Sequence, residues 1–431
     1  MLVAIGFIDC IQFFLKNGYL PSPFLFDKSD TFMDLFNPMY WAFDAGRYTE
    51  WGSVYPPLNF ILLRVLNFVS AGEWSGSPEF MRDNSPLVIM VFCLVYLVIP
   101  VVMLTMRHWQ GISTRDKILI YFVIILSPPM LFALERGNLV VLCPVFLAIV
   151  LSKIDFLRGI GIALLINFKP YFVIFLLYYA IRKDWKGLIY CTFLSGIFFM
   201  IPGLILDENY IFFLKNILDF SQEQNLFSLR EIMSFPASIS VFSYVLKNPE
   251  GAMFASRLIG LDKIPFVIIL IEFFKWSVII MSLVFLIKKS DVMRDEEIFT
   301  LLTLVITNLG IWVGGYTLIY YTALIPVFIK MRGHMIYMAF LSLMVMPLDM
   351  IPLIGESIGN QYSFLFSSTV YVDWTLGVGS MVRPIINIAL PMILCYEFLT
   401  RRCGLMNNCR ISNPVLSTDS CAVVNAFPGN T

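Results

Sequence analysis

The chain has 431 residues, of which 58% are hydrophobic and only 14% are charged. A soluble domain has about 25% charged residues and could not bury this much apolar surface, whereas a lipid bilayer does not require it to be buried. The 30 basic and 30 acidic residues give a formal charge of zero, which excludes the basic surface expected of a nucleic-acid-binding protein. The composition therefore predicts an all-α polytopic membrane protein.

Apolar runs predict about ten transmembrane helices, several of them shorter than the ~20 residues that a perpendicular helix needs. The first run begins at Met1 without a basic flank, so it is either a signal-like anchor or part of a segment that starts upstream. Residues 1–400 are expected to form one transmembrane domain, followed by a disordered tail at 401–431. The expected spans are 1–15, 86–106, 118–134, 138–152, 187–206, 264–287, 298–312, 317–329, 335–354 and 383–399.

Loop charge predicts the orientation of these spans. One set of loops, together with the tail, holds 16 Lys or Arg against 8 acids, whereas the opposite set holds 12 against 18. Because Lys and Arg accumulate in cytoplasmic loops, both termini are expected in the cytoplasm. The outer face then carries the first loop at 16–85, a large loop at 207–263 and a shorter one at 355–382.

Residues 159–181 are apolar enough to span, yet both flanks are basic and are expected on the cytoplasmic side. Pro170 removes a helix hydrogen bond and disfavours helix at Lys169. The two half-helices on either side of this turn, of about 9 and 11 residues at 1.5 Å per residue, reach only to the middle of the membrane. The pattern favours a re-entrant hairpin with Asn167 and Lys169 at its turn, where a lysine is tolerated if it lines a polar cavity or meets an anion. A tilted span with a snorkelling Lys169 is the alternative.

The first outer loop interleaves acids with aromatic residues. Tryptophan and tyrosine rings stack on sugar faces and carboxylates accept hydroxyl protons, so this composition suits a carbohydrate site. An interfacial aromatic belt with solvated acids explains the composition equally well. A rigid Tyr55-Pro56-Pro57 turn precedes an amphipathic helix, 58–69, which is predicted to lie in the outer interface. The residues concerned are Asp27, Asp30, Asp34, Asp44, Glu50, Tyr40, Trp41, Tyr48, Trp51 and Tyr55.

Three motifs in order resemble glycosyltransferase family 87 of the GT-C superfamily. An Asp is followed by Tyr40-Trp41-Ala42 and then by the Tyr55-Pro56-Pro57-Leu58 turn. Glu135-Arg136-Gly137-Asn138 and the turn Phe168-Lys169-Pro170 follow further along. The resemblance covers residues 20–190. It implies a GT-C-like fold and a hexosyltransferase that moves a sugar, with mannose among the candidates, from a polyprenyl-phosphate carrier to a lipid or glycan acceptor on the outer face of a bacterial inner membrane, in cell-envelope polysaccharide synthesis.

The resemblance also implies roles for individual residues. Asp34, six residues before Tyr40, best matches the catalytic aspartate, and Asp30 is its competitor. Tyr40, Tyr55, Glu135 and Asn138 lie in the shared motifs and are candidate substrate-binding residues. Such a transfer needs a base for the acceptor hydroxyl and cations for the leaving phosphate. The candidate phosphate-binding cations are Lys169, Arg136, Arg230 and Arg383.

The arginines also have structural interpretations. Arg383 can snorkel at the interface, Arg230 can pair with Glu231 or another loop acid, and Arg136 can pair with Glu135. No ligand spacing specifies a metal, although the acids could bind a divalent cation.

Further polar residues along the chain leave their roles open. Tyr316, Tyr320 and Tyr321 could line an acceptor groove or belong to an aromatic belt. Asp349 could close a cavity or bend a helix. Glu272 and Lys275 are expected to neutralise each other at i, i+3 spacing.

Two other functions remain open at this point. A transporter or flippase of lipid-linked saccharides would also explain broken helices and a mid-membrane lysine. It would not explain the acids and aromatics gathered on the outer side. An O-antigen polymerase or ligase acts on polyprenyl-linked sugars too, but that interpretation favours an outer histidine, and neither His108 nor His334 is expected outside. The expected partners are therefore a polyprenyl-phosphate sugar donor, a lipid or glycan acceptor and membrane lipids.

Overall fold

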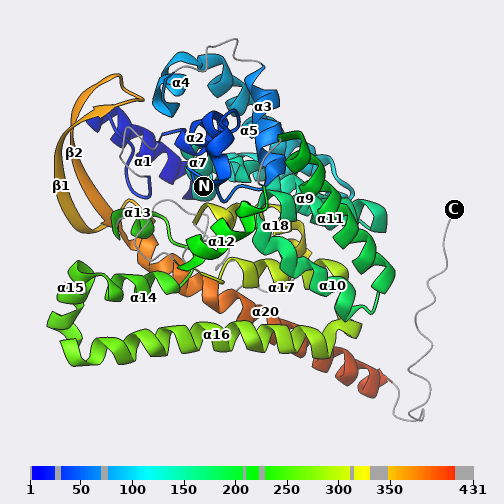
Figure 1. The fold of residues 1–431 in the computed structure, drawn as a ribbon. Coiled ribbons are helices and arrows are strands. Elements are labelled where there is room, and N and C mark those ends of the chain that lie inside the picture. Colours follow the sequence, from blue (N-terminus) through cyan, green and yellow to red (C-terminus); the bar gives the residue numbers. More distant parts are fainter. Residues whose placement is uncertain are drawn as a thin grey trace.

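The computed structural model describes residues 2–24, 31–68, 76–206, 210–222, 229–310, 315–330 and 348–412. It is mainly helical, with two long strands along one side (Figure 1). The first half contains α1 (Leu2–Asn17), α2 (Met33–Trp41), η1 (Ala45–Tyr48), α3 (Pro57–Asn67), α4 (Pro78–Asn84), α5 (Pro86–Thr105), η2 (Arg107–Trp109), α6 (Thr114–Ile125), α7 (Pro128–Arg136), η3 (Leu139–Leu142), α8 (Cys143–Val150), α9 (Asp155–Phe168), η4 (Pro170–Phe175), α10 (Leu176–Ile181) and α11 (Trp185–Leu206).

The second half continues with shorter helices before the longest ones. Its elements are α12 (Phe212–Gln222), α13 (Leu229–Ser234), α14 (Ser240–Lys247), α15 (Pro249–Ile259), η5 (Leu261–Lys263), α16 (Ile264–Lys289), η6 (Ser290–Val292), α17 (Asp295–Ile306), η7 (Gly315–Tyr320), α18 (Tyr321–Lys330), β1 (Pro352–Ser363), β2 (Ser368–Gly377) and α20 (Val378–Ser412). Helices α16 and α20 pack on each other along the edge of the molecule opposite to α2 and α4 (Figure 1).

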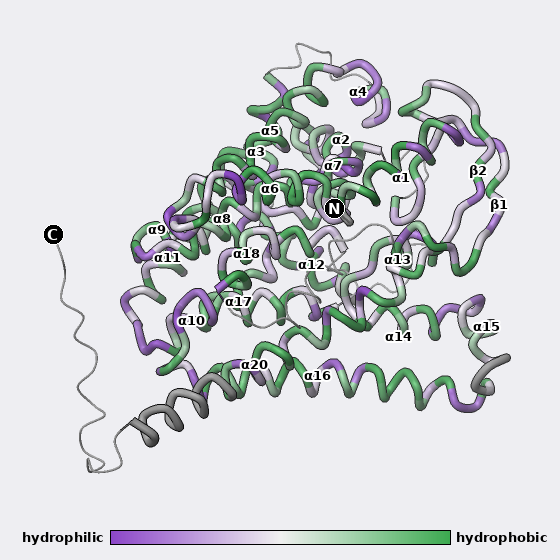
Figure 2. Tube along the Cα trace, turned by 180° about the vertical axis from the view of Figure 1, so that it is seen from behind, coloured by the Kyte–Doolittle hydropathy of each residue, from purple (hydrophilic) through white to green (hydrophobic). Residues whose placement is uncertain are grey.

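Four helices in the described ranges are long and apolar enough to cross a membrane: α5, α11, α16 with its flanking turns, and α20 as far as Leu399. A fifth is obtained if α6 and α7, bent by 50° at the Ser127-Pro128-Pro129 break, count as one span. Hydrophobic residues predominate along α5 and α16 (Figure 2), and large side chains of α16 face outward, among them Phe266, Ile269, Phe273 and Ile280. The chain is thus a multi-pass membrane protein.

The expected count of ten spans is not confirmed. The segment expected at 138–152 consists of η3 and the short α8, and Asn138 caps η3 by accepting from the Val140 amide at 2.9 Å. The segments expected at 298–312 and 317–329 are the short α17 and the pair η7–α18. Most of the segment expected at 335–354 lies outside the described residues.

The prediction of an all-α fold is wrong at 355–382. Strands β1 and β2 form an antiparallel hairpin that pairs Pro352 with Gly377 and Ser363 with Ser368. The alternating aromatic and β-branched residues of β2, Ser368–Gly377, have the composition of a strand. Helix α20 then runs through to Ser412, so the first part of the expected disordered tail at 401–431 is helical, and residues beyond 412 lie outside the described ranges.

Residues 155–181 form the hairpin predicted from Pro170. Helix α9 ends at Phe168, Lys169 is extended at φ −140° and ψ 103°, and η4 and α10 return. At the base of the hairpin, Arg158 of α9 donates to the Tyr178 hydroxyl of α10 at 2.8 Å. Arg158 and Arg182 both pair with Asp295, at 3.0 and 2.8 Å, which fixes the base to the segment that begins α17. Lys169 therefore lies at the tip, as predicted; its depth in a membrane stays a prediction.

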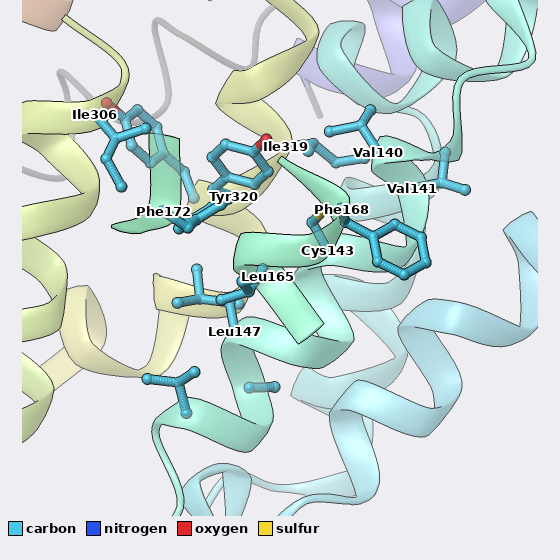
Figure 3. Close-up of a cluster of buried hydrophobic side chains, with 14 of the residues drawn as sticks. Val140, Val141, Cys143, Leu147, Leu165, Phe168, Phe172, Ile306, Ile319 and Tyr320 are labelled. Carbon is cyan, nitrogen blue, oxygen red and sulfur yellow. The ribbon is translucent and has the colours of Figure 1, made fainter. Parts of the chain in front are cut away.

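The main hydrophobic core surrounds this hairpin tip. Phe168 packs edge-to-face on Phe146 with ring centroids 4.9 Å apart, and Phe172 packs on Tyr320 at the same distance. Figure 3 shows Phe168 beside Cys143 and Phe172 beside Tyr320, so segments from both halves of the chain meet there. Because this core is closely packed, the position of Lys169 is fixed by its neighbours on both sides along the chain.

Candidate active site

Asp34 is held by two residues of the Glu135-Arg136-Gly137-Asn138 motif. The Arg136 guanidinium donates to one carboxylate oxygen of Asp34 at 3.1 Å, and the Asn138 amide donates to the other at 2.8 Å. A carboxylate oxygen has two lone pairs, so each oxygen can still accept another hydrogen bond. Asp34 is thereby oriented, with 19% of its side chain exposed. Its competitor Asp30 lies outside the described residues.

The loop before α2 is attached to the end of α7. The Phe32 amide donates to the Glu135 carbonyl at 2.8 Å, and the Thr31 hydroxyl donates to the Glu135 carboxylate at 3.0 Å. Arg82 of α4 donates to the Thr31 carbonyl at 3.1 Å. Glu135, a candidate substrate-binding residue, is buried, and the contacts described here join it to Thr31 and Phe32 of this loop. These contacts determine where Asp34, in the first turn of α2, points.

Gly137 allows this close approach. It ends α7 with φ +69°, a conformation that residues other than glycine adopt only at an energetic cost. A Cβ at this position would lie 2.9 Å from the Leu35 Cβ and 3.1 Å from the Phe32 Cα. Neither neighbour is the end of a flexible side chain, so α2 and α7 would have to separate.

We expect Gly137→Ala to lower both thermal stability and sugar transfer, because strain of ~1–3 kcal/mol at a left-handed residue is combined with displacement of Asp34. Gly196→Ala is the matched control, since a Cβ there meets nothing within 4 Å. Melting temperature in detergent and the initial rate of transfer are the measurements. Wild-type values of both for Gly137→Ala would show that α2 does not depend on this contact.

Lys169 lies near two tyrosine rings and within reach of the charge of Asp34. Its ammonium is 5.4 Å from the centroid of Tyr55 and 5.9 Å from that of Tyr316. Asp34 is close enough that its charge acts on Lys169, Tyr55 and Tyr316. Among the described residues Lys169 has no ion pair and no hydrogen bond from its ammonium. The site thus contains a lysine that is attracted to aromatic faces and is not neutralised by a contacting carboxylate.

The two tyrosines come from distant parts of the chain. Burial, followed by the charge of Asp34, raises the pKa of Tyr55 well above its ordinary value, and the same two causes raise the pKa of Tyr316. Both phenols therefore stay protonated and can donate hydrogen bonds to a substrate oxygen. Gly315 places Tyr316, since a Cβ at Gly315 would lie 1.9 Å from the Phe235 carbonyl oxygen.

The other tyrosines of the 316–321 segment are not available to a substrate groove. Tyr320 and Tyr321 are fully buried. The Tyr320 hydroxyl bonds to that of Tyr171 at 2.5 Å, and the Tyr321 hydroxyl bonds to Thr307 at 2.6 Å. These bonds connect η7 to the hairpin and the start of α18 to the end of α17, and the sequence offered no signal that separated these tyrosines from Tyr316.

Two predicted phosphate-binding arginines, Arg230 and Arg383, pair with acids other than Asp34. Arg230 pairs with Glu356 of β1 at 3.2 Å and lies over the Trp374 ring, so its partner is an acid of another loop. Arg383 is 2% exposed and pairs with the fully buried Asp349. This burial contradicts a snorkelling Arg383 and gives Asp349 a partner inside the protein.

A layer of aromatic rings separates Arg383 from the site. Its guanidinium lies 4.2 Å from the Phe235 centroid, Phe235 packs on Phe132 at 5.0 Å, and Phe132 stacks on Tyr316 at 6.2 Å.

In α16, Lys275 pairs with Glu272 and donates to Ser240 at 2.8 Å, which confirms the expected neutralisation. The structure therefore brings together Asp34, Arg136, Asn138, Tyr55 and Lys169 and adds Tyr316.

The described residues contain no group of three or more His, Cys, Asp or Glu side chains that could hold a metal ion.

The fold and site define a multi-pass membrane protein with a polar centre that contains one oriented carboxylate and, within reach of its charge, a lysine. Residues 54–288, more than half of the chain, match the model of glycosyltransferase family 87, and the chain belongs to that family. It is therefore a membrane glycosyltransferase, and the family expected from the three motifs is confirmed. No curated protein and no solved structure matches the chain. Asp34 and Tyr316 lie on either side of the matched region.

Proposed function

We propose that the protein transfers a hexose from a polyprenyl-phosphate carrier to a lipid or glycan acceptor at the outer face of a bacterial inner membrane, with both termini in the cytoplasm. The observation that supports this most is the placement of Asp34, oriented by Arg136 and Asn138, beside Lys169. A base for the acceptor hydroxyl and a cation for the leaving phosphate are the two groups that this chemistry needs. A contribution to cell-envelope polysaccharide synthesis is part of the proposal.

The proposed step is a single displacement. Asp34 takes the proton of the acceptor hydroxyl while the oxygen of that hydroxyl forms a bond to the anomeric carbon of the donor sugar. The bond between that carbon and the phosphate oxygen breaks, and the electron pair leaves with the polyprenyl phosphate. Lys169 stabilises the charge that grows on this leaving group, and Tyr55 and Tyr316 can donate hydrogen bonds to it.

The donor class is tested by incubating the purified protein with polyprenyl-phosphate-linked and nucleotide-linked sugars in parallel and measuring which is consumed. Consumption of only the polyprenyl-linked sugar, with a new glycosidic bond, is expected. Movement of a lipid-linked saccharide across the bilayer without bond formation would instead identify a transporter or flippase. Coupling of existing glycan chains would identify a polymerase or ligase.

The orientation gives an independent prediction. Cysteines introduced at the exposed positions Asn84 and Lys215, in a background without native cysteines, should react with an impermeant thiol reagent in intact spheroplasts. A cysteine at the exposed Lys153, beside the hairpin base, should react only after lysis. The reverse pattern would place Asp34 on the cytoplasmic side and rule out the proposed outer-face reaction.

A further inference from the structure

An exposed group of stacked rings stands at the C-terminal end of α2. Trp41 and Trp51 stack with centroids 5.9 Å apart at 24°, and Tyr40 meets Trp51 edge-on at 6.0 Å. Trp51 is 43% exposed although one of its faces rests on Trp41. Much of its surface therefore remains accessible although both neighbouring rings contact it, and the three rings together form a platform. We refer to Tyr40, Trp41 and Trp51 as the aromatic platform.

Two carboxylates border the aromatic platform. Asp44 accepts from the Trp51 indole N–H at 2.9 Å and from the Gly46 amide at 2.7 Å, and these two donors lower the pKa of Asp44. Glu50 is exposed and folds over Gly46, where a Cβ would lie 2.9 Å from its carboxyl carbon. Each ionised carboxylate keeps free lone pairs for hydroxyl donors. An exposed indole beside hydroxyl acceptors has the chemistry that recognises a sugar ring.

The loop that carries the platform is rigidly held. Arg47 is buried and donates to the Trp41 carbonyl at 3.0 Å, and Arg64 donates to the Ala42 carbonyl at 2.7 Å, so both cap the C-terminal end of α2. Asn216 of α12 donates to the carbonyls of Tyr48 and Ser53 at 2.9 and 3.1 Å. Little conformational entropy is lost when such a surface binds a ligand.

An interfacial aromatic belt is a poor explanation of this arrangement. A belt tryptophan turns its N–H toward lipid headgroups, whereas the N–H of Trp51 is bonded to Asp44. Asp44 and Glu50 also place negative charge at the exposed edge, and the phosphates of lipid headgroups repel it. The platform therefore fits a neutral polyhydroxylated ligand better than it fits a lipid surface.

We propose that the aromatic platform binds a sugar ring of the acceptor glycan that is remote from the hydroxyl being glycosylated. This rests on the proposed function, because Asp34 is taken to mark the point of transfer. Asp34 and Trp41 stand in the first and last turns of α2, seven residues or roughly 10 Å apart along the helix. A ring on Trp51 is thus well beyond the unit whose hydroxyl meets Asp34, and the acceptor must carry at least one further sugar.

The test uses membranes from cells that lack the protein, which retain its unmodified acceptor, together with a radiolabelled polyprenyl-phosphate sugar. Trp51→Ala is expected to raise the amount of membrane extract needed for half-maximal transfer about tenfold, as expected for the loss of one stacking contact. Its rate at saturating extract and its half-saturating donor concentration should match the wild type. The amount of extract that Trp51→Phe needs for half-maximal transfer should lie between those of the wild type and Trp51→Ala. Trp185→Ala, which removes a tryptophan that is 60% exposed at the start of α11, should have no effect.

The delipidated glycan released from the same extract distinguishes sugar from lipid recognition. It should compete with the acceptor for the wild type and much less for Trp51→Ala. An unchanged acceptor dependence in Trp51→Ala, or competition that is equal for both proteins, would overturn the proposal even while the wild type transfers sugar. Absence of transfer by the wild type with any polyprenyl-linked donor would instead overturn the proposed function.

Discussion

Asp34→Asn is expected to abolish sugar transfer while leaving the fold and donor binding largely intact. The amide cannot accept a proton from the acceptor hydroxyl, and loss of one well-placed base reduces a rate by roughly 10²–10⁴-fold. The substitution preserves the shape of the side chain between Arg136 and Asn138. Initial rates with radiolabelled donor, together with donor binding measured separately, provide the test.

Two comparisons make this result specific. Asp219→Asn, at an exposed acid of α12, should transfer sugar at the wild-type rate. Asp30→Asn tests the competing base. If Asp34→Asn kept near-normal turnover while Asp30→Asn was inactive, the general base would be Asp30, and the role of Asp34 would be limited to holding Arg136 and Asn138.

Lys169→Met is expected to keep the fold and to weaken both donor binding and transfer. A methionine fills similar space, and removing a charge that has no ion pair among the described residues relieves its desolvation cost. The loss should be larger for the transition state than for donor binding, because charge on the leaving phosphate grows as the bond breaks. Lys169→Arg should recover only part of the activity, since the planar guanidinium fits poorly between the rings of Tyr55 and Tyr316.

Lys275→Met is the matched control. Lys275 is buried more deeply than Lys169 and pairs with Glu272, so its removal leaves an uncompensated carboxylate in a membrane-spanning helix. This variant should melt at a lower temperature, whereas Lys169→Met should not. Rates are measured at saturating and at limiting donor. Wild-type rates for Lys169→Met under both conditions would remove Lys169 from the site and favour the snorkelling interpretation.

Local chain chemistry made part of the structure predictable. Pro170 removes a hydrogen bond and displaces its neighbour from helix, so the turn at Lys169 could be placed from sequence. The Tyr55-Pro56-Pro57 turn gave the start of α3 for the same reason. The positions of Asp34, Arg136 and Asn138 in spaced motifs made them candidates. Nothing in the local sequence indicated that Arg136 and Asn138 would both contact the Asp34 carboxylate.

The remaining differences have physical causes as well. A hydropathy window merges α6 and α7 across Ser127-Pro128-Pro129 and treats η3 with α8 as one segment, which is why more spans were expected than long helices were found. The β-hairpin was overlooked because its strands lie between apolar segments and were treated as loop by charge alone. The partners of Arg230 and Arg383 are 126 and 34 residues distant in sequence, and such pairs are set by tertiary packing.

The connection between Asp34 and Arg136, which are 102 residues apart, has a consequence for biogenesis. During synthesis the α2 segment emerges first and has no partner for its carboxylate until α7 is inserted. Lys169 follows later, and Tyr316 arrives only with the second half of the chain. Contacts between distant segments form slowly and late in folding. A nascent chain that ends before η7 would therefore contain the contact between Asp34 and Arg136 but would lack Tyr316, one of the two rings beside Lys169.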